Sequence, residues 1–98
     1  MPGYHSKSID NLIHVMAQIR DPEDCRAFLE DLCTIKELQD MAQRFETAIL
    51  LREGKNYQEI SAQMGISTAT ISRVSRCLNY GSGGYQKAME ILGKAEKK

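Results

Sequence analysis

The sequence lacks a net charge, a long apolar run and any regular spacing of cysteines. Its 98 residues carry 13 Lys/Arg and 13 Asp/Glu, a balance that argues against a polycation binding nucleic acid by charge alone. The longest uninterrupted apolar run, Ala48–Leu51, is far shorter than the segment needed to cross a bilayer. Because the N-terminus also lacks a signal-peptide pattern, we expect a soluble, cytoplasmic protein without a membrane partner.

Cys25, Cys33 and Cys77 form neither a CxxC pair nor a Cys/His spacing typical of zinc sites. They lie in apolar, helical surroundings, so we predict small buried side chains in a reducing compartment and no bound metal. Catalysis is equally unsupported, because the chain offers no plausible nucleophile–base pair. The glycines of residues 81–84 are not followed by the Lys-Ser/Thr of a phosphate loop. We therefore predict no catalytic residues and no enzyme.

Amphipathic helices account for most of the chain, since apolar residues recur every three or four positions. Residues 1–7 contain Pro and Gly and predict a flexible N-terminal arm. Residues 8–98 continue as one pattern, which predicts a single all-α domain of about six helices. The residues expected to cap helix starts are Ser8, Asp21 (before Pro22), Thr34 (with Glu37) and Asn56 (with Glu59).

The longest predicted helix runs from about Ile35 to Glu53 and ends at Gly54. Its apolar residues cover more than one narrow stripe, which in so small a protein implies burial on two sides. One side can pack on the subunit's own core, and a partner subunit could cover the other. The residues of this apolar belt are Ile35, Leu38, Met41, Ala42, Phe45, Ala48, Ile49, Leu50 and Leu51.

Residues 57–79 have the pattern of a helix-turn-helix, in which two short helices meet at a tight turn around Gly65. Gly65 can adopt a positive φ without a Cβ penalty, and Ser67 can cap the second helix. The apolar residues expected to face one interior are Ile60, Met64, Ile66, Ile71, Val74 and Leu78.

The outward face of the second helix carries short polar or basic side chains and no carboxylate. Residues 1–54 hold 6 Lys/Arg and 10 Asp/Glu, whereas residues 55–98 hold 7 and 3, so this helix lies in the basic half. Such a helix can enter a major groove with its N-terminal residues near base edges and its arginines near phosphates. The predicted base contacts are Thr68, Ala69 and Thr70, and the predicted phosphate contacts are Ser67, Ser72, Arg73, Arg76 and Gln58.

These features predict a sequence-specific transcriptional regulator that binds double-stranded DNA as a homodimer. A different class of function stays open. The same pattern would suit an ordinary helical hairpin with a solvated Ser/Thr face, in a dimerisation or adaptor module that has lost specific DNA binding. The zero net charge favours this alternative.

From about Leu32 to Leu92 the chain resembles the Trp repressor-like family. The resemblance implies an intertwined all-helical homodimer, acting as a repressor, whose helix-turn-helix units meet successive major grooves of a two-fold symmetric site. The matching segments are Leu32-Cys-Thr34, Arg44, Arg52-Glu-Gly54, Gln58-Glu-Ile60, Met64-Gly65, Ala69-Thr-Ile-Ser-Arg73, Ser75 and Leu78.

In the tryptophan-responsive members of that family, two arginines hold the indole between them and one binds the carboxylate. The resemblance places Thr34, Arg44 and Arg73 at the corresponding effector positions. However, Val74 stands where the family pattern has glycine, and a branched side chain there would project toward the space of the indole. We therefore predict no cofactor and expect tryptophan to fit poorly, while another small-molecule corepressor stays open.

Overall fold

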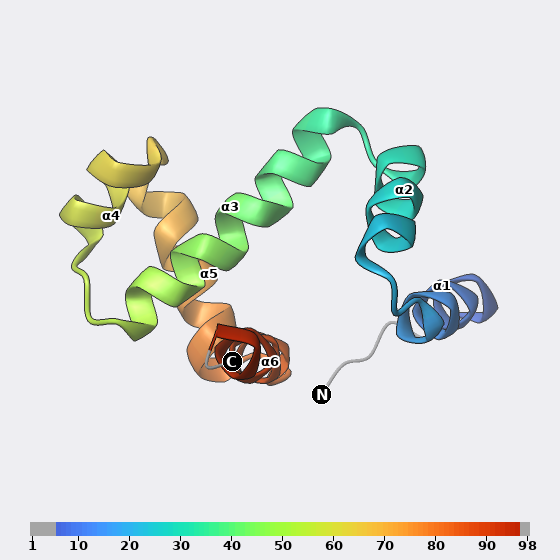
Figure 1. Ribbon diagram of the computed structural model, residues 1–98. Coiled ribbons are helices and arrows are strands. Elements are labelled where there is room, and N and C mark those ends of the chain that lie inside the picture. Colours follow the sequence, from blue (N-terminus) through green and yellow to red (C-terminus); the bar gives the residue numbers. More distant parts are fainter. Residues whose placement is uncertain (1–5, 97–98) are drawn as a thin grey trace. The chain divides into compact units, whose positions relative to one another are not determined.

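The computed structural model describes residues 6–96, which fold into six α-helices (Figure 1). The predicted all-α class with about six helices is therefore confirmed. The chain divides between Gln39 and Asp40 into two compact units. In the described part of the chain no helix is long and apolar enough to span a membrane. The helices are α1 (Lys7–Gln18), α2 (Pro22–Leu32), α3 (Ile35–Arg52), α4 (Tyr57–Met64), α5 (Thr68–Tyr80) and α6 (Gly84–Glu96).

Local side-chain capping sets where most of these helices begin. The Thr34 hydroxyl accepts from the Glu37 N–H at 3.0 Å, and the Glu37 carboxylate accepts from the Thr34 N–H at 2.8 Å. Asn56 and Glu59 form the same reciprocal capping box at the start of α4. Asp21 caps α2, accepting from the Asp24 N–H at 3.3 Å. Each of these three predicted caps is confirmed.

The first helix begins earlier than predicted. Ser6, not Ser8, is the N-cap of α1, and its hydroxyl accepts from the Ile9 N–H at 3.1 Å. Two serines two residues apart offer the same capping chemistry, and the helix uses the first of them. Ser6 and Lys7 therefore do not belong to a flexible arm, and the rest of the predicted arm, residues 1–5, lies outside the described residues.

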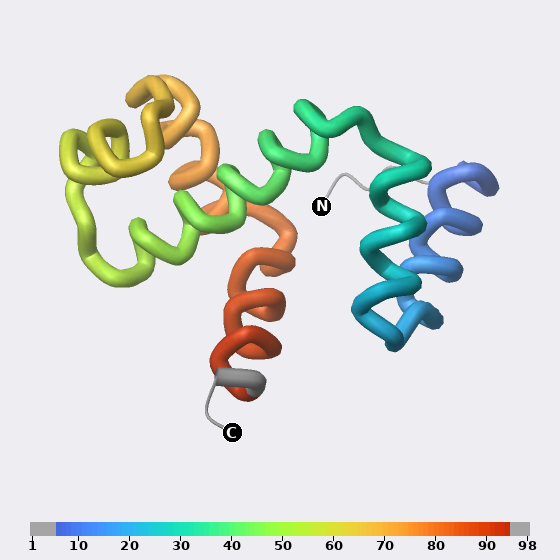
Figure 2. The backbone as a smooth tube through the Cα atoms, turned by 45° about the horizontal axis from the view of Figure 1, so that its top comes forward, coloured from blue at the N-terminus to red at the C-terminus, as the bar shows by residue number. Residues whose placement is uncertain are grey.

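The N-terminal unit comprises α1, α2 and the start of α3, and Figure 2 traces the short connections between them. No side chain in residues 6–39 is buried. Ile35, at the start of α3, is 78% exposed. Further exposed apolar residues of this unit are Ile9, Ile13, Val15, Met16 and Leu32.

The C-terminal unit holds the core of the protein. Leu50 of α3, Ile60 of α4 and Ile71 of α5 form a buried cluster. Leu51, Met64 and Ile66 pack against it. This cluster joins α4 and α5 to the second half of α3, and it is where the sequence pattern places the interior of the helix-turn-helix.

One part of the sequence interpretation needs correction. The cysteines are not buried, because Cys25 and Cys33 are partly exposed and Cys77 is exposed. In a helix an apolar neighbourhood in sequence does not fix which side faces the core, so the composition around a cysteine is a poor guide to its burial. The apolar belt of α3 is buried on one side, at Ala48 and Leu50, whereas Met41 is exposed. Cover of the exposed side by a partner subunit stays a prediction.

Candidate nucleic-acid interface

The turn between α4 and α5 sets the position of α5. Gly65 adopts the left-handed conformation, with φ 68° and ψ 35°, and its N–H donates to the Ser61 carbonyl at 2.9 Å. The Ser61 hydroxyl donates to the Ile66 carbonyl at 2.7 Å, which ties the first helix to the far side of the turn. The Ser67 hydroxyl then accepts from the Thr70 N–H at 3.2 Å and caps α5. This small loop holds the two helices in a fixed relation.

The buried and exposed faces of α5 are clearly separated. Ile71, Val74 and Leu78 are buried. The eight residues predicted to contact DNA are all exposed, seven on or at the start of α5 and one on α4: Ser67, Thr68, Ala69, Thr70, Ser72, Arg73, Arg76 and Gln58. The structure thus brings these side chains to the surface of one helix pair.

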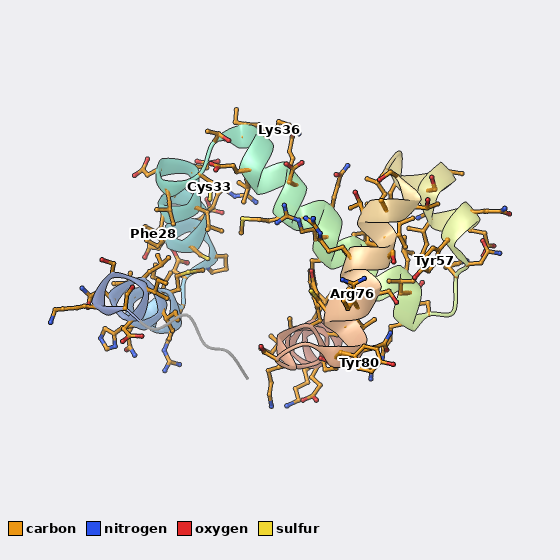
Figure 3. All side chains as sticks on the ribbon, turned by 180° about the vertical axis from the view of Figure 1, so that it is seen from behind. Phe28, Cys33, Lys36, Tyr57, Arg76 and Tyr80 are labelled. Carbon is orange, nitrogen blue, oxygen red and sulfur yellow. The ribbon has the colours of Figure 1, made fainter. Side chains whose placement is uncertain are left out.

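One line of residues on α5 faces away from the core and is called the α5 ridge below: Ala69, Arg73, Arg76 and Tyr80. Successive members are three or four positions apart, so they share one side of the helix. Figure 3 shows Arg76 and Tyr80 on this helix, with Tyr80 at its C-terminal end. Tyr80 is 87% exposed.

The charge around the α5 ridge is positive. No Asp or Glu occurs between Glu59 and Glu90, whereas Arg73 and Arg76 lie in the middle of that interval. Within residues 6–96 neither arginine forms an ion pair or a side-chain hydrogen bond. Two exposed, unneutralised guanidinium groups beside hydroxyl groups make a surface suited to phosphate oxygens.

A cavity of about 250 Å³ lies between α3 and the start of α5. Arg44 and Arg73, two of the predicted effector residues, both line it. The hydroxyl of Thr34, the third predicted effector residue, is engaged in the capping box of α3. The complete lining is Asp40, Gln43, Arg44, Ile66, Ser67, Thr70, Arg73 and Val74.

A second, more apolar cavity adjoins the junction of α5 and α6 and is lined in part by Phe45, Cys77 and Tyr85. Burial raises the pKa of the Tyr85 phenol above its usual value of 10.0, and the nearby Cys77 acts in the same direction. The Arg44 guanidinium opposes both effects. Among the described residues, no three His, Cys, Asp or Glu side chains gather to hold a metal ion.

The family of this chain follows from a match to a known family model. Residues 7–92 match the family model described as Trp repressor protein. The chain belongs to the Trp repressor family.

Relatives within the Trp repressor family support this assignment along nearly the whole chain. The uncharacterised protein YerC of Bacillus subtilis (strain 168) is 48% identical over 90 residues, which cover 92% of this chain and 86% of YerC. A TrpR-like protein from Eubacterium eligens ATCC 27750, solved by crystallography, is 43% identical with a TM-score of 0.84, covering 90% of this chain and 91% of that one. A crystal structure from Staphylococcus aureus, provisionally described as a Trp repressor, is 34% identical with a TM-score of 0.84, covering 91% and 89%.

Membership of the Trp repressor family raises the question of whether the first cavity suits tryptophan. Arg44 and Arg73, whose guanidinium planes could stack on an indole, line it together with the apolar side chains of Ile66 and Val74. Val74 forms part of the wall and is only 2% exposed, so it packs into the core and cannot move aside without leaving a void. Val74 therefore restricts the space in which an indole could lie between Arg44 and Arg73.

Proposed function

We propose that this protein is a homodimeric transcriptional repressor that binds double-stranded DNA through its helix-turn-helix. The observation that carries this proposal is the exposed, carboxylate-free face of α5, with two unpaired arginines. Membership of the Trp repressor family supports it. In this role the protein binds DNA and catalyses no reaction.

The length of α5 suggests which of its residues contact bases and which contact phosphates. Its 13 residues extend over about 20 Å, and a major groove is about 12 Å wide. When the N-terminal turn lies at the base edges, Thr68, Ala69 and Thr70 contact the bases. Ala69 and the threonine methyl groups suit thymine methyl groups, and the hydroxyls suit donors or acceptors on the bases.

Phosphate contacts would then surround this reading end of α5. Arg73 and Arg76 lie farther along the helix, where the groove is bounded by the sugar–phosphate backbone. Gln58 and Ser72 add neutral donors. The Ser67 hydroxyl accepts from the Thr70 N–H and shares a further hydrogen bond with the Thr70 hydroxyl at 3.1 Å. When the Thr70 hydroxyl donates in that bond, the Ser67 hydroxyl can donate to a phosphate oxygen.

Burial supports the homodimer. No side chain in residues 6–39 is buried, and several large apolar side chains there are exposed, so this unit gains little hydrophobic stabilisation within one chain. A second subunit that covers these side chains and the open side of α3 would supply it. A two-fold symmetric dimer would place its two α5 helices about 34–36 Å apart, one turn of DNA.

Val74 in the wall of the cavity between α3 and α5 leaves little room for the indole of tryptophan. We propose that DNA binding by this protein does not require tryptophan. Arg44 and Arg73 remain placed to bind the anionic group of a different small molecule in the same cavity. Of the three effector residues predicted from the sequence, these two carry that role.

The central test is selection of bound sequences from random duplex DNA, followed by fluorescence anisotropy titrations at several salt concentrations. We expect the wild-type protein to select a two-fold symmetric sequence. Arg76→Ala should weaken binding across sequences and reduce the slope of log K against log salt by about one unit for each lost phosphate contact. Lys87→Ala is the matched control, since it removes an exposed cation of α6 that pairs with Glu90 at 3.7 Å.

The results would separate the two classes of function. Sedimentation measurements should show a dimer. A dimer that selects no sequence would indicate a dimerisation or adaptor module instead. An unchanged salt slope in Arg76→Ala would exclude Arg76 as a phosphate contact.

Regulation is tested with the same DNA and with calorimetry. Tryptophan should neither bind the wild-type protein tightly nor change its DNA affinity. Val74→Gly, which opens the cavity wall, should increase tryptophan affinity relative to wild type. Tight, saturable tryptophan binding by the wild-type protein would refute the proposed independence.

A further inference from the structure

Tyr80 is the most exposed of the large apolar and aromatic side chains that the structure describes as exposed, at 87%. It lies at the last position of α5, immediately before Gly81. A large ring in this position makes no evident contribution to the core, because the buried side of the helix is formed by Ile71, Val74 and Leu78. The ring is therefore accessible to another molecule.

Tyr80 continues a line of cationic residues. It follows Arg76 by four positions and Arg73 by seven, so all three side chains leave the helix on the same side. The nearest carboxylate in sequence is Glu90, which lies on α6. The helix α5 combines guanidinium groups with a phenol and carries no carboxylate of its own, although Asp40 of α3 lines the cavity beside Arg73. Such a helix surface is complementary to a polyanion.

The length of the helix indicates which part of a DNA duplex Tyr80 would meet. Ala69 and Tyr80 are eleven residues apart, which corresponds to about 16 Å along the helix axis. The major groove is about 12 Å wide and 8.5 Å deep. With Ala69 at the base edges, which form the groove floor, Tyr80 lies beyond the groove rim, near the flanking sugar–phosphate backbone.

We infer that Tyr80 is a further DNA-contact residue, whose phenolic O–H donates a hydrogen bond to a phosphate oxygen of the backbone flanking the groove read by α5. This inference rests on the proposed DNA-binding function. Tyrosine is one of the side chains that donate to phosphate oxygens in DNA complexes, and such contacts fix register without reading sequence. Tyr80 thus sets how far α5 enters the groove, while Arg76 supplies charge.

A neutral donor has a distinctive signature in salt titrations. A lysine or arginine on a phosphate releases counterions, so its loss changes the salt slope. The Tyr80 phenol carries no charge when it donates its proton in a hydrogen bond. Its loss should therefore lower the affinity by the same factor at every salt concentration.

The experiment compares Tyr80→Phe, Tyr80→Ala and Arg76→Ala on the sequence selected by the wild-type protein. Tyr80→Phe should reduce affinity about two- to tenfold for each subunit, the effect of one lost hydrogen bond, with an unchanged salt slope. Tyr80→Ala should reduce it at least as much. Thermal melts of both variants should match wild type, because the side chain is almost fully exposed.

Tyr85→Phe provides a matched control, since it removes the same oxygen from a partly buried ring of α6. It should leave DNA affinity unchanged. Wild-type affinity in Tyr80→Phe would overturn the phosphate contact, and a loss confined to Tyr80→Ala would assign the effect to the ring instead. If Arg76→Ala weakens binding and Tyr80→Phe does not, only this inference fails. If the wild-type protein selects no sequence, the proposed function itself fails.

Discussion

Replacing Thr47 by valine should stabilise the protein. Thr47 lies on α3, its side chain is 0% exposed, and its hydroxyl has no hydrogen-bond partner. A threonine within a helix usually donates to the carbonyl four residues earlier, which here belongs to Gln43. The buried hydroxyl has therefore lost its bonds to water without gaining a replacement.

The expected gain follows from this burial. Leaving a polar group buried and unsatisfied costs about 1–3 kcal/mol. Valine has nearly the same shape as threonine and a similar helix propensity, so it removes the cost without opening a void or weakening the helix. We expect Thr47→Val to raise the free energy of unfolding by about 1–3 kcal/mol. For a chain of this size each kcal/mol corresponds to about 4–8 °C in Tm.

Urea denaturation at a fixed protein concentration measures this change. The midpoint should rise while the m-value, which reports the surface exposed on unfolding, stays constant. Thr68→Val is the matched control, because the exposed Thr68 hydroxyl is solvated and its removal should change stability by less than about 0.5 kcal/mol. A midpoint in Thr47→Val that is unchanged or lower would refute the reasoning and show that the hydroxyl is satisfied in solution.

Two further predictions concern the turn and the second cavity. Gly65→Ala should destabilise the protein by about 1–2 kcal/mol, since the residue has φ 68° and an added Cβ would meet no atom, so that only backbone strain acts. Gly84→Ala, at a position with equally open space and no positive φ, should be neutral or stabilising in the same urea titrations; equal losses in both would contradict this account. Because burial raises the pKa of Tyr85, the folded state holds that proton more tightly than the unfolded state does. The resulting stability is complete below pH 10 and is lost as the pH rises through the folded-state pKa, so Tm should fall more steeply above pH 10 in wild type than in Tyr85→Phe; parallel curves would argue against the shift.

The helix boundaries were predictable from sequence because local chemistry determines them. The reciprocal bonds of Thr34 with Glu37 and of Asn56 with Glu59 involve residues three apart, so neither needs tertiary information. The left-handed turn at Gly65 is similarly local. The start of α1 was misplaced by two residues because Ser6 and Ser8 carry the same capping group.

Features that depend on packing between helices could be predicted less well from the sequence. The periodicity of α5 predicted its buried face correctly, but the exposure of Cys77 depends on which side of α5 meets α3 and α6. The cavity between α3 and α5 could be suggested only through the family resemblance, which supplied Arg44 and Arg73. Asp40 and Gln43 were missed because their role in the lining depends on how α3 and α5 meet.

The unburied N-terminal unit has a consequence for the lifetime of the protein in a cell. In the proposed homodimer a second subunit covers the exposed apolar side chains of this unit. A unit that lacks this cover opens easily, and open segments are the preferred substrates of proteases. Newly made copies would thus be degraded faster than assembled ones. Turnover would then hold the pool of unassembled copies low, and the amount of intact protein would rise steeply, not proportionally, with the rate of synthesis.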